Sequence, residues 1–540
     1  MRTRGPRTSV SSRDRRRQAA GDKASSLSRL IGGACIAIAS SAGAEPWHIS
    51  ASATAQATYT NNVDFAPSGQ RESDLVTSLT GTIGIAGGSP RLKLNGSLAL
   101  TASVDAKGNR NSSIAPVGGL NGTFEAIENF AFVDVAASLA QTYISPFGPQ
   151  PRDLANDTSN RYTSQTYSVG PYVRGILPGN LSYTVRDQNT WTVASRVGDT
   201  ATTLPPAYAN TLSANVTRSA APLGWTVDYN RSYYDSGAPE GTSVVETARG
   251  SLPFRVDPQL QLALRAGYER DRFRDRRVQS SIYGVGGEWQ PTERTNITGI
   301  WEHRFFGAGY SLDITHRLPR AALTASFSRD LSNYPQLALT IPAGANVANF
   351  LDAAFTTRIA NSAERALAVE QFLARTGLAT TLFTPVNFFA TTFVLQTSQR
   401  ASLVLLGVRN SITFTVFHVK SATVVDDPVL STDIVPAALQ FNQNNTQTGA
   451  GVNVSHSLSG FTNVNAYANA ARVTADSSAT ENVVNRATNA NLGVNLSTQV
   501  GHRTTATIGV GYSRFLPEGG TNSSGSSAFN VFAALTHTFR

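Results

Sequence analysis

Apolar and polar residues alternate along most of the chain, and this alternation predicts its secondary structure. In the segment 491–500 (NLGVNLSTQV), leucine and valine occupy one parity, whereas the other carries asparagine, glycine, serine and glutamine. Successive side chains of a β-strand point to opposite faces, so such a segment forms a strand with one apolar and one polar face. The pattern returns in the segments 48–60, 91–104, 260–269, 450–459, 463–471 and 505–513. The chain is therefore predicted to be all-β.

The connections between these segments alternate in length. Short turns lie at 87–90, 177–179, 255–258, 291–294, 318–320, 459–462 and 501–504, and longer polar loops lie at 61–74, 105–118, 143–160, 195–207, 426–446 and 517–526. Short periplasmic turns and long external loops are typical of outer-membrane barrels. We therefore predict a large transmembrane antiparallel β-barrel of about 22 strands, in the range of roughly 18–24, with its apolar face toward lipid. A soluble β-rich adhesin is the alternative fold.

One segment departs from the alternation and is predicted to form a helical insert in an external loop, at residues 345–378. Asn361 and Glu364 have the spacing of a capping box at a helix N-terminus. Val369, Phe372 and Leu373 share one apolar face. This insert either folds into the mouth of the barrel as a plug or decorates the outside as a dock for a partner, and the sequence leaves both hypotheses open.

The N-terminal residues 1–44 are predicted to be a signal peptide, and residues 45–540 the barrel. A basic stretch precedes an apolar core, and small residues at Ala42–Ala44 form a cleavage site near Ala44. The apolar core is shorter than the roughly 20 residues of a transmembrane helix, although a short membrane anchor is the alternative. The only cysteine, Cys35, lies in this leader. The mature chain is thus expected to lack disulfides and to lie in the bacterial outer membrane.

The positive charge of the chain is concentrated in the leader. The net charge is +9, and residues 1–44 hold nine Arg/Lys and two Asp, which gives +7 and leaves +2 for the rest. No nucleic-acid partner is therefore expected. The expected partners are outer-membrane lipid and the barrel-assembly machinery, because the C-terminal segment 531–539 alternates and ends in Phe539, which resembles the signal that this machinery recognises. Arg540, which follows, departs from that signal.

Charged residues of the middle of the chain fall on the polar parity and are predicted to face the lumen. An arginine facing lipid at mid-bilayer would cost about 2–4 kcal/mol, which makes the lumen the only favourable location. These charges either tune permeability to charged solutes or form ion pairs that stiffen the wall, and the second explanation is the simpler. The residues are Arg265, Glu269, Glu288, Glu302, Arg304, Asp313 and Arg317.

Aromatic residues near strand ends are expected to contribute to the girdles at the two membrane interfaces. They are Tyr268, Trp289, Trp301, Tyr512 and Phe515.

No sequence motif indicates an enzyme. The seven histidines are scattered, and the chain has no HExxH motif, no GxSxG elbow and no phosphate-binding loop. No catalytic, metal-binding or cofactor-binding residues and no cofactor are therefore predicted. A barrel enzyme with a Ser/His pair on its outer wall is the alternative.

Several motifs in order carry a family resemblance. They are ENFAFVDVAASLAQTYISPFGPQ (128–150), YSVGPYVRG (167–175), NSAERALAVEQFLARTGL (361–378) and VLLGVRNSITFTVF (404–417). The chain resembles the outer-membrane proteins associated with the PEP-CTERM/exosortase system, an uncharacterised β-barrel family linked to exopolysaccharide. The resemblance implies a channel or export component whose cargo is a polysaccharide or an exported protein. A non-conducting scaffold that docks partners through the insert is the alternative function.

Overall fold

The fold is a closed antiparallel barrel of 22 strands, as predicted. Each strand pairs with its neighbours in the sequence, and β1 pairs with β22 to close the sheet. The computed structural model describes residues 47–108, 113–195, 205–237, 242–274, 276–344, 382–424, 444–476, 484–519 and 524–539, together with single positions between 347 and 373. Closure leaves no strand edge unpaired, which a sheet in lipid requires.

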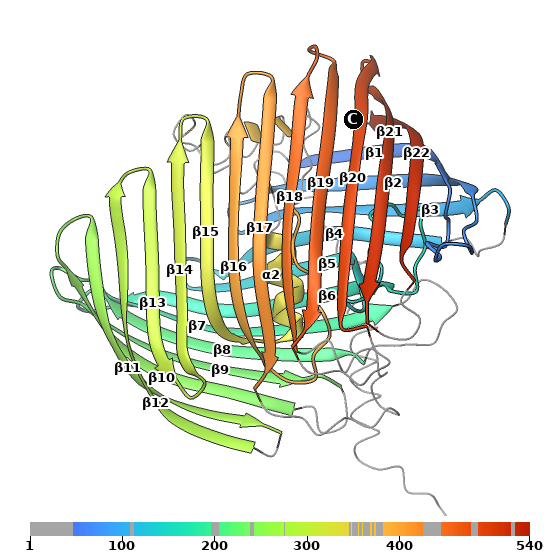
Figure 1. The fold of residues 1–540 in the computed structure, drawn as a ribbon. Helices are drawn as coiled ribbons and strands as arrows, with labels where there is room; N and C mark the ends of the chain where they lie inside the picture. The colour runs from blue at the N-terminus through green and yellow to red at the C-terminus, as the bar shows by residue number, and fades with distance from the viewer. Residues whose placement is uncertain are drawn as a thin grey trace, which may run out of the picture.

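The strands run in sequence order around the barrel (Figure 1). Their bounds are β1 His48–Thr60, β2 Asp74–Gly88, β3 Leu92–Asp105, β4 Ser113–Ile127, β5 Ala131–Tyr143, β6 Arg161–Leu177, β7 Leu181–Ser195, β8 Ala207–Arg218, β9 Trp225–Asp235, β10 Thr242–Arg255, β11 Leu260–Phe273, β12 Arg276–Thr292, β13 Thr295–Arg304, β14 Gly307–Leu318, β15 Ala321–Ser332, β16 Val394–Leu406, β17 Asn410–Thr423, β18 Asn445–Ser457, β19 Thr462–Ala475, β20 Arg486–Gly501, β21 Thr504–Glu518 and β22 Ser526–Phe539.

All long loops lie at one end of the barrel, and the opposite end has short turns only. The long-loop end also has two short connections of two residues each, between β11 and β12 and between β13 and β14. Both ends of the strand sequence lie at the short-turn end, where Ala51 pairs with Phe539. Two of the short turns place Asn129 (φ 55°) and Asn180 (φ 58°) in the left-handed region, which asparagine tolerates better than most residues. By the layout of outer-membrane barrels, the short-turn end is periplasmic and the long-loop end is external.

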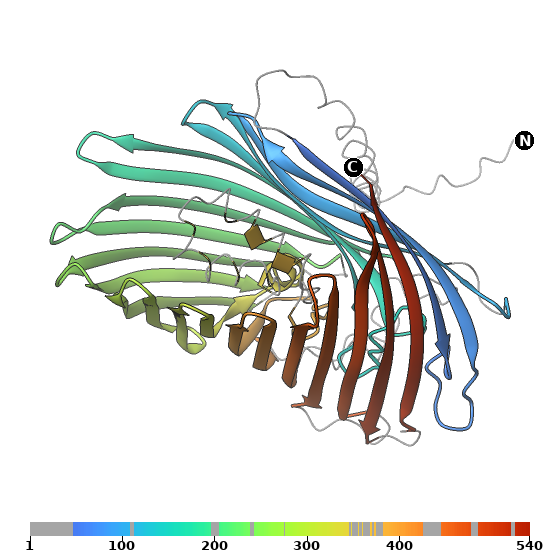
Figure 2. The same cartoon turned by 90° about the horizontal axis from the view of Figure 1, so that it is seen from above.

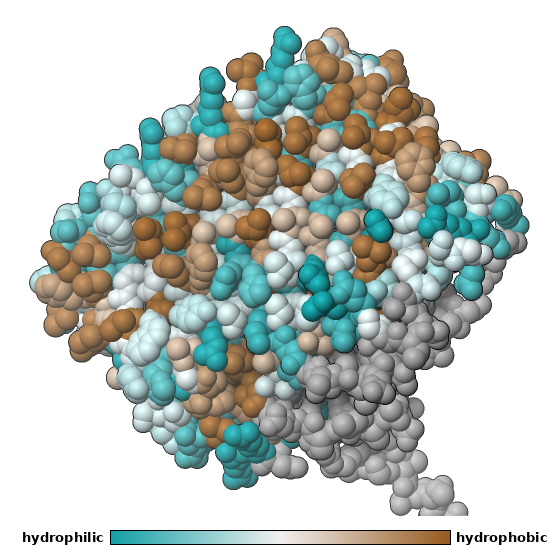
Figure 3. Space-filling view, viewed as in Figure 1, coloured by the Kyte–Doolittle hydropathy of each residue, from teal (hydrophilic) through white to brown (hydrophobic). Residues whose placement is uncertain are grey.

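The outer face of the wall is apolar. In β20, Leu492 and Val494 are 50% and 46% exposed on the outside, while Asn491 is buried on the inside and donates a hydrogen bond to Asn469. Hydrophobic side chains gather over the outer wall toward its short-turn end (Figure 3). An apolar outer face around a polar interior fits only a lipid surrounding, and the protein is an outer-membrane β-barrel.

The helical part of the chain lies inside the barrel. Helix α2 (Tyr334–Gly344) starts directly after β15 and contacts β6, β7 and β8 on the opposite wall. Seen from above, it lies in the space enclosed by the strands (Figure 2). Helical structure therefore begins before residue 345, the start that the sequence predicted. Among the described residues, no helix is long and apolar enough to cross a membrane.

Candidate functional site: the lumen and the segments that fill it

Residues 333–393, here called the lumenal insert, join β15 to β16 and reach the periplasmic half of the lumen. Val347, Leu351 and Val369 of the insert are buried together with Leu382 and with Val404 of β16. The insert leaves β15 at the external end, whereas Val404 lies ten residues along β16 from its external start at Val394. At a rise of about 3.3 Å per residue, the insert descends roughly 33 Å along the wall.

Two of the predicted helix-face residues extend this contact. Phe372 and Leu373 are partly buried against the same cluster, beside Leu406 of β16. The predicted capping pair, Asn361 and Glu364, lies outside the described residues. The described parts of the insert thus pack against the inner wall, which is the arrangement expected of a plug.

The return segment 382–393 is fixed to the wall by hydrogen bonds. Gln447 of β18 binds the backbone of Val386 twice: its Oε1 accepts from the Val386 N–H at 2.9 Å, and its Nε2 donates to the Val386 carbonyl at 3.0 Å. Ser243 of β10 lies 3.1 Å from Thr392 between their hydroxyl oxygens. The segment is therefore attached to both sides of the barrel.

Aromatic side chains hold the insert at the external half of the lumen. The hydroxyls of Tyr162 in β6 and Tyr334 in α2 are 2.7 Å apart, and both side chains are buried. Tyr234 in β9 donates a hydrogen bond to the carbonyl of Ala390, and its ring lies 5.9 Å from that of Phe393. Such packed ring pairs add to the apolar area that the insert buries against the wall.

A second segment, residues 144–160 between β5 and β6, crosses the lumen on the other side and is here called the cap loop. Its Asn156 donates to Thr60 of β1 at 2.9 Å and accepts from Asn530 of β22 at 2.6 Å. Arg152 places its guanidinium 3.8 Å from the ring centre of Tyr467 in β19. The cap loop therefore joins the β5–β6 wall to the β19–β1 wall.

One predicted girdle residue belongs to this internal contact. Phe515 of β21 packs in a buried cluster with Phe147 of the cap loop and Phe65, so its placement in the aromatic girdle was wrong. The parity of the strand decides this, because Tyr512 and Phe515 are three residues apart and must face opposite sides. Tyr268, Trp289 and Trp301 are 45%, 47% and 42% exposed on the outer face.

Four of the seven predicted lumenal charges meet in two buried ion-pair groups. Glu269 accepts from Arg304 Nε at 2.6 Å and from the backbone N–H of Phe305 at 2.6 Å. Glu302 accepts from Arg265 Nε at 2.7 Å and from Arg249 Nε at 3.1 Å. Glu269 and Arg304 are 0% and 4% exposed, so their charges depend on each other.

Glycine makes the second group possible. Arg265, Gly284 and Glu302 are directly opposite one another on β11, β12 and β13. A Cβ at Gly284 would lie 3.0 Å from Cγ of Glu302 and closer still to backbone atoms. The glycine therefore lets Arg265 reach across one strand to Glu302.

The other three predicted charges do not join these groups. Glu288 is exposed and accepts from Gln290 at 2.6 Å. Arg317 donates to the carbonyl of Glu293 at 2.7 Å near the periplasmic end, and Asp313 is exposed. The sequence prediction also missed Arg249 and Asp330, the latter an ion partner of Arg304 at 3.2 Å. Both residues lie on the inward parity of their strands, so a strict use of parity would have predicted them as lumenal charges.

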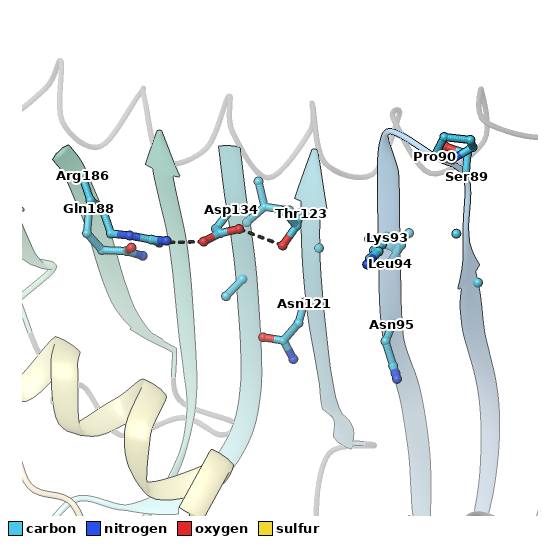
Figure 4. Close-up of a pocket in the computed structure, with 15 residues that line it drawn as sticks. Ser89, Pro90, Lys93, Leu94, Asn95, Asn121, Thr123, Asp134, Arg186 and Gln188 are labelled. Carbon is cyan, nitrogen blue, oxygen red and sulfur yellow. Dashed lines mark hydrogen bonds and ion pairs between the residues drawn. The ribbon is translucent and has the colours of Figure 1, made fainter. Parts of the chain in front are cut away.

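A polar cavity of about 990 Å³ opens among β2–β7 toward the periplasmic end (Figure 4). Arg186 of β7 pairs with Asp134 of β5 at 2.6 Å, and Thr123 of β4 donates to the other oxygen of Asp134 at 2.7 Å. The amide side chains that share the lining are Asn95, Asn121 and Gln188, and Lys93 adds a cation. The cavity offers amide and hydroxyl groups to a polar solute. Among the described residues, no group of three or more His, Cys, Asp or Glu could hold a metal ion.

No family model and no curated protein sequence matches the chain. Several solved receptors and transporters align with it at low similarity. The FrpB iron transporter of Neisseria meningitidis (F3-3 variant) aligns at 9% identity and a TM-score of 0.45, over 91% of this chain and 81% of that one. The siderophore receptor PirA of Pseudomonas aeruginosa aligns at 7% identity and a TM-score of 0.39, over 91% and 80% of the two chains. Similarity of this degree carries no information about cargo.

Proposed function

We propose that the protein is a gated outer-membrane channel, and that the lumenal insert is the gate. The observation that supports this most directly is the course of the insert, which enters from the external end and packs against Val404 near the periplasmic end. The cap loop narrows the remaining space on the β19–β1 side. Passage therefore requires the insert to move, or to leave a path beside it.

The attachments of the insert suit a movable element. Most are uncharged hydrogen bonds and apolar packing, such as Gln447 with Val386 and Val404 with Leu351. The guanidinium of Arg274 adds one long contact, at 3.4 Å, to the hydroxyl of Thr391. Each uncharged hydrogen bond contributes only about 0.5–1.5 kcal/mol net, because water replaces it when the insert leaves. No buried ion pair of the described residues joins the insert to the wall, so release separates no such pair.

The inner surface favours a neutral, polyhydroxylated cargo. In β17–β22 and β1, every inward position is occupied by an uncharged or histidine side chain, and asparagine, serine and threonine dominate. Amides and hydroxyls exchange hydrogen bonds with sugar hydroxyls without the strong attraction of a fixed charge. A segment of exopolysaccharide has this chemistry. The link to PEP-CTERM export rests on the sequence resemblance alone, and an exported protein is the alternative cargo.

Single-channel conductance in planar bilayers tests the gate. The mature protein is compared with a variant in which residues 345–381 are replaced by a short Gly/Ser linker, after both are shown to be folded by heat-dependent electrophoretic mobility. We expect large, stable steps in the deletion variant and rare ones in the intact protein, because the deletion removes Val347, Leu351 and Val369 from the contact with Val404.

Two results would count against this function. Equal steps from both proteins would mean that the insert is not a gate. If neither folded protein produced conductance steps, the channel hypothesis would be rejected in favour of the alternative, a non-conducting scaffold. The cargo is tested separately: a neutral glucan oligomer should block the conducting variant reversibly, and a block only by charged peptides would favour protein cargo.

A further inference from the structure

Four arginines face outward at the external ends of β9–β12, a region that the proposed channel does not use. They are Arg231 of β9, Arg270 and Arg272 of β11, and Arg277 of β12, and all four are exposed. In β11 they share parity with Leu264, which is 66% exposed on the outer face. These four residues are here called the outer arginine patch.

The strand register brings the like charges together. Arg272 lies directly opposite Arg277, and Arg231 and Arg270 lie on either side of Glu246. Like charges directly opposite in a sheet destabilise it. Glu246 accepts a hydrogen bond from the hydroxyl of Tyr229 at 2.9 Å, and no carboxylate of the described residues forms an ion pair with any of the four arginines.

Cations at the same height on the other side of the barrel are arranged differently. Lys420 of β17 pairs with Asp476 at 2.9 Å, and Glu518 of β21 pairs with Arg486 at 3.0 Å and with Arg472 at 3.7 Å. Each of these three cations therefore has a carboxylate partner. On the β9–β12 side, Glu246 and Asp235 share the outer face with the four arginines but form no ion pair with them, and the arginines outnumber these carboxylates.

The patch lies where the membrane surface should be. Tyr229, Ala248 and Tyr268 form the outward row next to Arg231, Glu246 and Arg270, on the membrane side. Tyr283, also on the outside, is 53% exposed. Tyrosine rings mark the interface level of an outer-membrane barrel. Arg231 and Arg270 lie one row, and Arg272 and Arg277 two rows, further toward the external loops, and are thus at the height of lipid headgroups.

We propose that the outer arginine patch binds the phosphate groups of an anionic lipid in the external leaflet. Guanidinium groups match phosphate oxygens with two parallel hydrogen bonds, and they remain charged at any physiological pH. A phosphate between Arg272 and Arg277 would replace the repulsion between them by two attractions. The acyl chains of the same lipid would lie along the apolar wall below, beside Tyr268 and Leu264.

Lipid retention measured by native mass spectrometry tests this site. The full mature barrel in detergent micelles is incubated with bis-phosphorylated lipid A, and bound lipid is counted. One variant carries Arg270→Gln, Arg272→Gln and Arg277→Gln, and the matched control carries Lys420→Gln, Arg472→Gln and Arg486→Gln. Both remove three outward cations near the same interface, and the folding of each is checked by heat-dependent mobility.

We expect the patch variant to retain at least about tenfold less lipid A than wild type. The control variant should retain an amount within about twofold of wild type, since cations with a carboxylate partner gain less from a phosphate. Lipid A without phosphates should bind the wild type as weakly as the patch variant binds the phosphorylated form. Retention by the patch variant, or equal loss in both variants, would overturn the site. Full competition by an equal concentration of inorganic pyrophosphate would show a soluble-anion site in place of a lipid site.

Discussion

Two parts of the inner wall have opposite chemistry. The wall of β10–β15 holds buried carboxylates and guanidiniums, such as Glu269 with Arg304, that bind one another across strands. The wall of β17–β22 and β1 has no Asp, Glu, Lys or Arg at its inward positions and carries asparagine instead, as at Asn465, Asn491 and Asn495. The first wall pairs Glu269 and Glu302 with its own arginines, although Oδ2 of buried Asp271 has no hydrogen-bond partner among the described residues. The second wall leaves amides and hydroxyls for the insert, the cap loop or a solute. We infer that the charged wall stabilises the barrel and that the neutral wall forms the passage.

The largest effect is expected from breaking the charged wall. Glu269→Ala would leave Arg304 buried with only the exposed Asp330 as a partner, and we expect a loss of about 3–5 kcal/mol in the free energy of unfolding. Guanidinium unfolding of the barrel in lipid vesicles measures it. Glu288→Ala is the control, because Glu288 lies exposed on the same wall. Equal stability of the two variants would remove the structural role of the charged wall.

A charge placed under the insert should release it. Val404 is 0% exposed beneath the insert, so Val404→Asp would bury a carboxylate among apolar side chains, at a cost of several kcal/mol in that conformation. We expect a much higher open probability in planar bilayers. The control is Ser402→Asp, because Ser402 lies on the same inward face two residues away and is only half-buried. We expect this control variant to open less often than Val404→Asp. An open probability unchanged by Val404→Asp would contradict the docked conformation as the closed state.

Removing the amide that holds the return segment should have a smaller effect. Gln447→Ala removes both hydrogen bonds to Val386, and we expect the docked insert to lose about 1–3 kcal/mol because the Val386 N–H then lacks its partner. Hydrogen exchange at residues 382–393 should accelerate without a change in barrel stability. Asn465→Ala, which removes a bond within the wall to Asn495, is the control and should leave this exchange rate as in wild type.

The smallest effect is expected from adding one charge to the neutral wall. In the conducting deletion variant, Asn495→Asp should shift the reversal potential toward cation selectivity by less than about twofold in the permeability ratio, since salt screens a single charge in a wide lumen. Asp313→Asn removes an exposed charge from the opposite wall and should shift it in the other direction. A loss of conductance in Asn495→Asp would mean that the open path is much narrower than the lumen.

Much of the barrel follows from sequence alone, for a physical reason. Side-chain direction in a strand has a period of two residues, so the inward or outward position of Leu492, Asn491 or Arg265 depends on its own segment. The alternation of short turns and long loops likewise indicated about 22 strands and the two ends, although two-residue turns between β11 and β12 and between β13 and β14 break it at the long-loop end. The same local rule also misled where it was not applied strictly: Phe515 was assigned to the outer girdle from its place near a strand end, although its parity directs it inward.

The tertiary structure decided which distant residues meet. Arg265 reaches Glu302 only because the register places Gly284 between them, and Gln447 binds Val386 only because the insert folds inward. An amphipathic helix buries its apolar face equally well against a partner or an inner wall, so the sequence could not choose between a dock and a plug. Long-range contacts depend on closure of all 22 strands, which no single segment encodes. The sequence by itself therefore determined the wall and its two faces, and the folded barrel alone decided what fills it.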